Sequence, residues 1–304
     1  MEKRPLGNTG LAVTALSYGA MELRQLGEPE ASRVLNAALD SGINYLDTSP
    51  DYGPSEAYIG KAVAHRRDEF YLASKCGCHI DEGGKRLDPG HIWSREHLLW
   101  NVETSLRLLK TDRIDVWQLH GTVPAELAGG KADPVIQTMQ DLKRQGKVRS
   151  IGISFRNGRP NDPLYPAGYG SKYLSELMQW GVFDVMQIVY GGLIRRNETR
   201  IARAAERGIG MISRGVVRKY SENYAELFER AGLDEFRENG ESRNSFLIRF
   251  ALCHAGISTL IIGTKSADHL AENIRAAARG KLADAVYAEA KRRLDAIGIV
   301  AEPA

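Results

Sequence analysis

Four ionisable side chains have the chemical types needed to move a proton onto a carbonyl oxygen. They are a carboxylate (Asp47), a phenol (Tyr52), an ammonium group (Lys75) and an imidazole (His120). The pKa of an unperturbed tyrosine is about 10, so its phenol is a poor acid near neutral pH unless a cation stabilises the phenolate. We expect Lys75 to be that cation and to lower the pKa of Tyr52, while Asp47 pairs with Lys75 and fixes its position.

An imidazole suits the remaining task, which is to orient the carbonyl oxygen. His120 can donate a hydrogen bond to that oxygen, and the charge of a histidine is adjustable near neutral pH. None of the four side chains can supply electrons for a reduction. The set therefore implies a bound reduced nicotinamide, which delivers a hydride to an aldehyde or ketone.

Each of these residues ends, or closely follows, a segment with the composition of a β-strand. Asp47 ends the segment 44–47 with Tyr52 in the turn-rich residues after it, Lys75 ends 70–75, and His120 ends 113–120. The parallel strands of a barrel bring their carboxyl ends to one mouth, whereas branched apolar side chains fill the interior. Ionisable residues at successive strand ends therefore indicate an active site rather than a core.

The whole chain repeats this order of strand and helix. Strands are expected at 15–18, 44–47, 70–75, 113–120, 150–154, 184–190, 210–213 and 259–262, and helices at 28–41, 55–63, 94–109, 134–145, 172–179, 198–207, 242–254 and 266–277. Eight such repeats in 304 residues favour an α/β fold of the (β/α)8 TIM-barrel class. An open doubly wound sheet is the second choice, but no G-x-G-x-x-G fingerprint follows its first strand.

Additions to the barrel are expected at both ends of the chain. An N-terminal β-hairpin is expected from residues 3–6 and 11–14, and an extra C-terminal helix from 283–297. The segment 76–93 has the polar, glycine-rich composition of a loop, and 214–240 that of an insert with one helical piece. Since no linker or low-complexity segment interrupts the chain, we expect residues 1–304 to form a single domain.

Composition and charge favour a cytoplasmic enzyme with a small-molecule substrate. Lysine and arginine (41) nearly balance aspartate and glutamate (38), and no basic block indicates a nucleic-acid or membrane-surface partner. No apolar run approaches the roughly 20 residues that cross a bilayer, and the N-terminus lacks the apolar segment of a signal peptide. Three cysteines are typical of a reducing compartment.

No metal is expected. The spacing of Cys76 and Cys78 is wrong for a zinc knuckle, and no second cysteine pair completes one. His79, His91 and His97 are interpreted as loop and surface residues, and a metal site that they would form with Asp81 and Glu82 is the alternative. The arginines near residue 200 (Arg195, Arg196 and Arg200) are expected to be solvated at a helix start.

Several segments together resemble the aldo-keto reductase superfamily over nearly the full length. They are RPLGNTGLAV, INYLDTSPDYG, FYLASK, SLRLLKTDRIDVWQLH, QGKVRSIGIS, FDVMQIVY and IIGTKSADHLAENI. The resemblance implies a (β/α)8 barrel that reduces carbonyl groups with a nicotinamide dinucleotide, usually NADP, without a Rossmann domain. It also implies that Asp47, Tyr52, Lys75 and His120 are the catalytic residues, with Tyr52 as proton donor.

The resemblance further implies a set of cofactor contacts. Ser154 and Gln187 would hold the nicotinamide carboxamide, but Phe155 stands where the family has an asparagine and Arg214 where it often has a stacking aromatic. Lys265 and His269 stand where the family binds the 2′-phosphate, which favours NADP over NAD, and Glu272 and Asn273 match the adenine contacts. The remaining expected contacts are Gly19, Met21, Asp47, Ser213, Gly215, Val216, Gly263 and Thr264.

Two other classes of function stay open at this point. The barrel can instead be a nicotinamide-binding regulatory or partner-binding subunit with little turnover, as some relatives are. A metal-dependent barrel hydrolase is a third possibility, which predicts stoichiometric zinc. The chain is expected to be a monomer or a small homo-oligomer, and its physiological substrate and preferred reaction direction are not readable from these residues.

Overall fold

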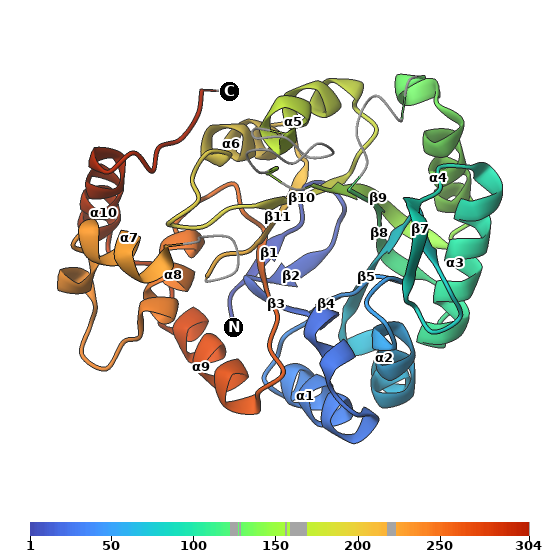
Figure 1. Cartoon of the computed structure of the whole chain (residues 1–304), viewed down its shortest axis with the longest axis horizontal. Coiled ribbons are helices and arrows are strands. Elements are labelled where there is room, and N and C mark those ends of the chain that lie inside the picture. Colours follow the sequence, from blue (N-terminus) through green and yellow to red (C-terminus); the bar gives the residue numbers. More distant parts are fainter. Residues whose placement is uncertain (122–126, 128, 156, 159–168, 218–222, 304) are drawn as a thin grey trace.

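The computed structural model is a closed barrel of eight parallel strands surrounded by helices (Figure 1). It describes residues 1–121, 127, 129–155, 157–158, 169–217 and 223–303. The barrel strands are β3 (Leu16–Gly19), β4 (Tyr45–Asp47), β5 (Tyr71–Cys76), β8 (Ile114–His120), β9 (Val148–Ser154), β10 (Val185–Val189), β11 (Gly210–Arg214) and β12 (Thr259–Ile262). Strand β12 pairs in parallel with β3 and closes the barrel, which confirms the predicted fold class.

The helices follow the strands in the predicted alternation. They are α1 (Glu28–Asp40), α2 (Ser55–Val63), α3 (Arg95–Leu109), α4 (Pro134–Arg144), α5 (Tyr169–Trp180), α6 (Glu198–Glu206), α7 (Tyr224–Arg230), α8 (Arg243–Leu252), α9 (Ala267–Arg279) and α10 (Asp284–Ala296). Within the described ranges, no helix is both long and apolar enough to cross a membrane.

The N-terminal hairpin closes one end of the barrel. Its strands β1 (Lys3–Pro5) and β2 (Ala12–Thr14) are antiparallel, as predicted. Their connection carries Leu6 and Leu11 into a buried cluster with barrel residues such as Tyr45. Gly7 has a φ of +51°, and a Cβ there would lie 2.3 Å from the carbonyl oxygen of Gly208, so only glycine permits this approach.

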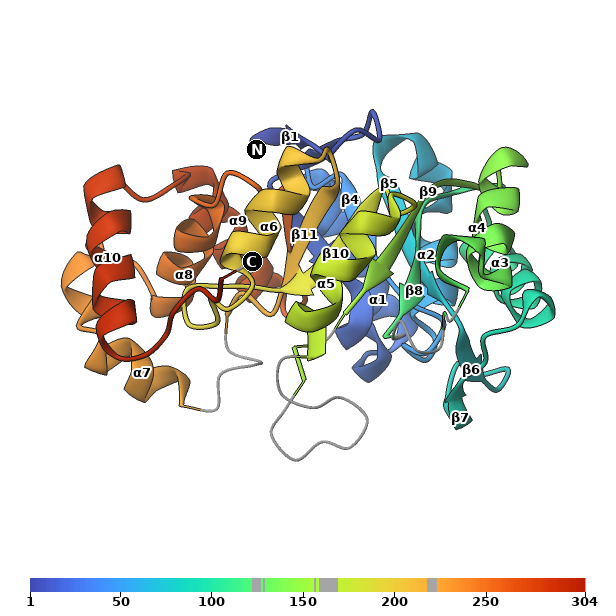
Figure 2. The same ribbon diagram turned by 90° about the horizontal axis from the view of Figure 1, so that it is seen from above.

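The predicted loop 76–93 is instead a second hairpin. Strands β6 (Cys78–Ile80) and β7 (Arg86–His91) are antiparallel, with Cys78 opposite His91 (Figure 2 shows this hairpin at the end of the barrel away from β1). The side chain of Asp81 accepts hydrogen bonds from the backbone N–H groups of Gly83 and Lys85, which builds the turn. The polar composition hid this hairpin, because its strands lack the alternation of a half-buried sheet.

The C-terminal helix packs outside the barrel. Leu294 and Ala290 of α10 are buried in a separate cluster with Phe228 of α7 and Phe246 and Phe250 of α8. This cluster explains why a helix with no following strand is stable, since its apolar face is covered by α7 of the insert and by α8. The extra C-terminal helix was predicted and is confirmed.

Candidate active site

A buried ion pair lies at the carboxyl ends of β4 and β5. The Nζ atom of Lys75 donates hydrogen bonds to Oδ2 of Asp47 at 2.8 Å and to the carbonyl oxygen of Thr48 at 2.7 Å. Burial alone would lower the pKa of Lys75, but Asp47 and Tyr52 raise it above its ordinary value of 10.5. Lys75 is therefore a fixed cation at neutral pH, as the pairing with Asp47 predicted.

The second oxygen of Asp47 is held by two further strands. Oδ1 accepts hydrogen bonds from the amide of Gln187 on β10 at 2.9 Å and from that of Gln118 on β8 at 3.3 Å. Gln187 in turn accepts one from the hydroxyl of Ser154 on β9 at 2.8 Å. Residues of four strands thus hold the carboxylate in place, and the role of Gln118 is one that sequence reasoning missed.

Tyr52 lies beside this pair, half-buried at the mouth. The Nζ atom of Lys75 is 5.1 Å from the centre of its ring. Burial raises the pKa of Tyr52 above its ordinary value of 10, and this effect outweighs the opposing influence of Lys75 and Arg214. The expected net lowering by Lys75 is therefore not found in this structure, because desolvation of the phenolate is the larger effect. Tyr52 carries its proton at neutral pH.

His120 faces Tyr52 across the mouth. Their rings are edge to face with centres 6.1 Å apart. The Nδ1 atom of His120 lies 3.1 Å from Sγ of Cys78, 3.3 Å from Oγ of Ser49 and 3.4 Å from Oδ1 of Asp51. Burial lowers the pKa of His120 more than Asp51 raises it, so the imidazole is neutral near pH 7.

Asp51 connects His120 to the second hairpin. Its carboxylate accepts hydrogen bonds from the hydroxyl of Ser49 and from the guanidinium of Arg86 on β7. Burial alone would raise the pKa of Asp51, but His120, Ser49 and Arg86 bring it below its ordinary range. In the sequence Ser49 and Asp51 look only like turn formers, and the contact of Asp51 with Arg86 depends on the hairpin that was not predicted.

A protonated carboxyl group lies behind the ion pair. Glu56, at the start of α2, is buried and accepts hydrogen bonds from the hydroxyls of Ser74 at 2.5 Å and Ser105 at 3.2 Å. Burial raises its pKa from 4.5 to about 7, although both hydroxyls oppose the shift. The folded protein therefore binds a proton here that the unfolded chain releases between these two pH values.

The raised pKa of Glu56 predicts a pH-dependent stability. Because the folded state prefers protonated Glu56, its contribution is complete below about pH 4.5 and is lost as the pH rises through about 7. In Glu56→Gln, we expect the variation of the free energy of unfolding with pH to be smaller by up to about 3 kcal/mol. Urea unfolding of both proteins at pH 5 and pH 8 measures it; equal changes in both proteins would show that Glu56 does not bind the proton.

The expected cofactor residues line the same end of the barrel. At one side, the exposed Lys265 precedes α9, whose first turn carries the exposed His269. Lys265 donates a hydrogen bond to Gln25 of the 3-10 helix Ala20–Gln25 at 3.1 Å. The hydroxyl of Ser266 caps α9 by accepting from the N–H of His269 at 3.3 Å. Two exposed basic side chains beside a helix N-terminus are a donor set that fits a phosphate group.

The two unusual cofactor positions contact each other. The side chain of Phe155 is fully buried in the core, and its carbonyl oxygen accepts a hydrogen bond from the guanidinium of Arg214. Arg214 also acts on the pKa of Tyr52, so its charge lies close to the mouth. The absent asparagine is therefore replaced by an apolar core residue, and the absent aromatic by a half-buried guanidinium.

The other expected contacts lie on adjoining strand ends and loops. Gly19 ends β3 and Gly263 follows β12, and a Cβ on Gly19 would lie 2.7 Å from Ile261. Glu272 accepts a hydrogen bond from the hydroxyl of Ser242, and Asn273 is buried. The rest are Met21, Ser213, Gly215, Val216 and Thr264, of which Ser213, Val216 and Thr264 are buried.

The fold and the arrangement at its mouth define a (β/α)8 barrel protein whose site lies at the carboxyl ends of the strands. Residues 15–294 match the model of the Aldo/keto reductase family, and the chain belongs to this family. It is 29% identical over 310 residues to the oxidoreductase YqkF of Bacillus subtilis, covering 93% of this chain and 94% of that one.

A plant enzyme and a solved structure show the same likeness. L-galactose dehydrogenase of Arabidopsis thaliana is 27% identical over 297 residues, which cover 91% of this chain and 88% of the relative. An aldo-keto reductase of Bacillus halodurans, solved in a holo form, superimposes with a TM-score of 0.77 at 28% identity, covering 96% of each chain. Family membership supports an oxidoreductase that acts on carbonyl or alcohol groups of small molecules.

Proposed function

We propose that this chain is a nicotinamide-dependent reductase that converts an aldehyde or ketone to an alcohol, with Tyr52 as the proton donor. The observation that carries the proposal is the buried Lys75, which is paired with Asp47 and lies beside the ring of Tyr52 at the mouth. A buried cation next to a phenol stabilises the phenolate that forms when the proton leaves.

The proton of Tyr52 moves to the carbonyl oxygen as the carbonyl carbon accepts a hydride. Tyr52 is protonated in the resting state, because burial keeps its pKa above 10. Lys75 compensates the negative charge left on the phenol, and Asp47 keeps Lys75 in position through its own contact with Gln187. Since these partners come from strands rather than loops, they need no rearrangement when the charge develops.

His120 orients the carbonyl oxygen through its Nε2–H group. Nδ1 of His120 lies 3.1 Å from the thiol of Cys78 and 3.4 Å from Oδ1 of Asp51. We propose the tautomer in which Nδ1 accepts from the thiol, since Asp51 already accepts from the hydroxyl of Ser49. Burial raises the pKa of Cys78, which keeps the thiol protonated. A neutral imidazole that accepts at Nδ1 carries its proton on Nε2, and this N–H can donate to the substrate.

When bound, the reduced nicotinamide supplies the hydride. We propose that Ser154 and Gln187 hold its carboxamide and that the guanidinium of Arg214 lies against its ring. Lys265 and His269 are proposed to bind the 2′-phosphate of NADPH, with Glu272 and Asn273 at the adenine. We further propose that residues 1–304 act as a single domain in the cytoplasm, as a monomer or a small homo-oligomer.

A screen of aldehydes and ketones with NADPH and NADH tests the proposed activity. We expect substrate-dependent oxidation of cofactor, followed by absorbance, with at least one carbonyl class. If neither cofactor is oxidised above background, the reductase proposal is wrong and the partner-binding function is favoured instead.

Replacing Lys265 tests the proposed preference for NADPH. We expect Lys265→Ala to weaken NADPH binding by about 10- to 100-fold, because a charge-assisted contact with the 2′-phosphate is lost, and to leave NADH binding nearly unchanged. Fluorescence titration gives both dissociation constants. Lys281→Ala, which removes another exposed lysine, is the matched control. An equal loss of affinity for NADPH and NADH would show that Lys265 does not bind the 2′-phosphate.

A further inference from the structure

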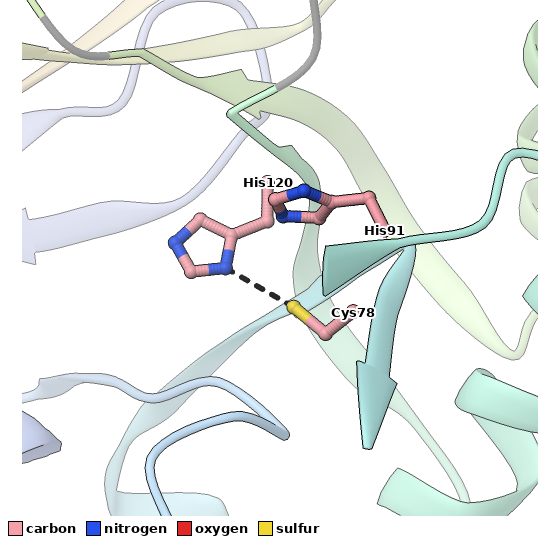
Figure 3. Close-up of side chains that lie close together, drawn as sticks. All are labelled: Cys78, His91 and His120. Atoms are coloured by element: carbon pink, nitrogen blue, oxygen red, sulfur yellow. Dashed lines mark hydrogen bonds between the residues drawn. The ribbon is translucent and has the colours of Figure 1, made fainter. Parts of the chain in front are cut away.

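Three metal-ligand side chains converge at the mouth of the barrel. One ligand atom from each of Cys78, His91 and His120 lies within 4.8 Å of those of the other two. Figure 3 shows His120 and His91 on the same side of the Cys78 thiol, with the dashed line joining Nδ1 of His120 to Sγ. Cys78 and His91 come from paired strands of the hairpin, and His120 comes from the end of β8.

The hairpin holds Cys78 and His91 in fixed positions. The carbonyl oxygen of Cys78 accepts hydrogen bonds from Asn101 at 3.3 Å and from Nε2 of His97 at 3.0 Å. The ring of His91 stacks on that of Trp93, with centres 5.5 Å apart and planes at 10°. At Gly77, with a φ of +81°, a Cβ would lie 2.1 Å from the Trp93 ring, so the link between β5 and β6 requires glycine.

The donor set selects a thiophilic ion. Thiolate and imidazole are zinc ligands, whereas calcium and magnesium require oxygen. Around a tetrahedral zinc with bonds of about 2.0–2.3 Å, neighbouring ligand atoms lie about 3.3–3.8 Å apart. The ligand atoms of Cys78, His91 and His120 therefore need shifts of only about 1 Å, and the carboxylate of Asp51 lies beside His120 to offset the added charge.

We propose that Cys78, His91 and His120 bind one Zn²⁺ ion at this mouth, with a fourth coordination position left open, and that the bound ion inhibits carbonyl reduction. Binding replaces the proton of the Cys78 thiol and draws the imidazole of His120 toward the hairpin, away from Tyr52. The inhibition rests on the proposed function, since it removes the group that orients the carbonyl oxygen. The binding of zinc does not depend on that function.

Cobalt titration of the full chain tests the metal site directly. We expect one Co²⁺ per chain with a thiolate-to-cobalt absorption band, and displacement of Co²⁺ by Zn²⁺. Cys78→Ser should abolish the band, and His91→Ala should weaken binding by about tenfold or more. His79→Ala is the matched control, because this histidine lies on the same hairpin but bonds to the carbonyl oxygen of Pro89. Absence of the band in the wild type, or equal cobalt affinity in the His91→Ala and His79→Ala variants, would overturn the site.

The second measurement follows reductase activity with and without zinc. We expect stoichiometric Zn²⁺ to inhibit the wild type and a chelator to restore its activity. His91→Ala is expected to keep its zinc-free turnover and to lose the inhibition. Full turnover with zinc bound would overturn the inhibitory role. Because the cobalt spectrum requires no turnover, a failed carbonyl screen and a failed metal site give different results.

Discussion

Tyr52→Phe is expected to lower turnover by about 10²- to 10⁴-fold while cofactor binding persists, because the variant lacks only the hydroxyl group whose proton the substrate oxygen receives. The phenyl ring can keep the position beside Lys75, whose Nζ atom lies 5.1 Å from the ring centre. The loss should therefore appear in kcat rather than in the dissociation constant of NADPH. Single-turnover kinetics with saturating cofactor and a fluorescence titration separate the two quantities.

Tyr45 offers a matched control for this substitution. It is a fully buried tyrosine on β4, two residues before Asp47, and its hydroxyl has no hydrogen-bond partner among the residues that the structure describes. Tyr45→Phe therefore removes the same atom from the same barrel without touching the mouth, and we expect its turnover to match the wild type. If Tyr52→Phe also retained near-normal turnover, another group would have to be the acid.

The arrangement of the candidate site was predictable because of where barrel strands end. Asp47, Lys75 and His120 were each placed at a strand end from the sequence, and the closed barrel brings those ends to one mouth. The contacts that a local pattern cannot show were missed. Gln118 lies inside the predicted strand 113–120, and only the closed barrel brings its amide to Asp47.

Long-range contacts explain the other errors. The predicted loop 76–93 forms a hairpin, and its Arg86 side chain reaches Asp51 in a different loop. This hairpin also carries His91 to His120, although His91 was interpreted as a surface residue. Arg195 was expected in solvent but is buried, where it bonds to Glu198 and to Asp295 of the C-terminal helix. The contacts of Arg86 with Asp51, of His91 with His120 and of Arg195 with Asp295 join residues distant in sequence, so a local pattern does not reveal them.

The second large effect is expected from Lys75→Met, which should both destabilise the fold and impair proton transfer. Removing the cation leaves Asp47 as a buried charge without its partner, a change that costs about 3–5 kcal/mol in comparable buried pairs. Urea unfolding measures this loss. Lys61→Met removes a lysine from the exposed pair with Glu28 and is the control, for which we expect almost no change in stability.

The dependence of turnover on pH in Lys75→Met distinguishes a role of Lys75 in proton transfer from a purely structural role. Lys75 lowers the pKa of Tyr52 relative to what burial alone would give, so its removal raises that pKa further. Turnover that depends on protonated Tyr52 falls as the pH rises through this pKa, and the fall should move to higher pH in the variant. Lys75→Arg, which keeps the charge, should shift it less. An unmoved profile with lowered stability would show that Lys75 supports the fold alone.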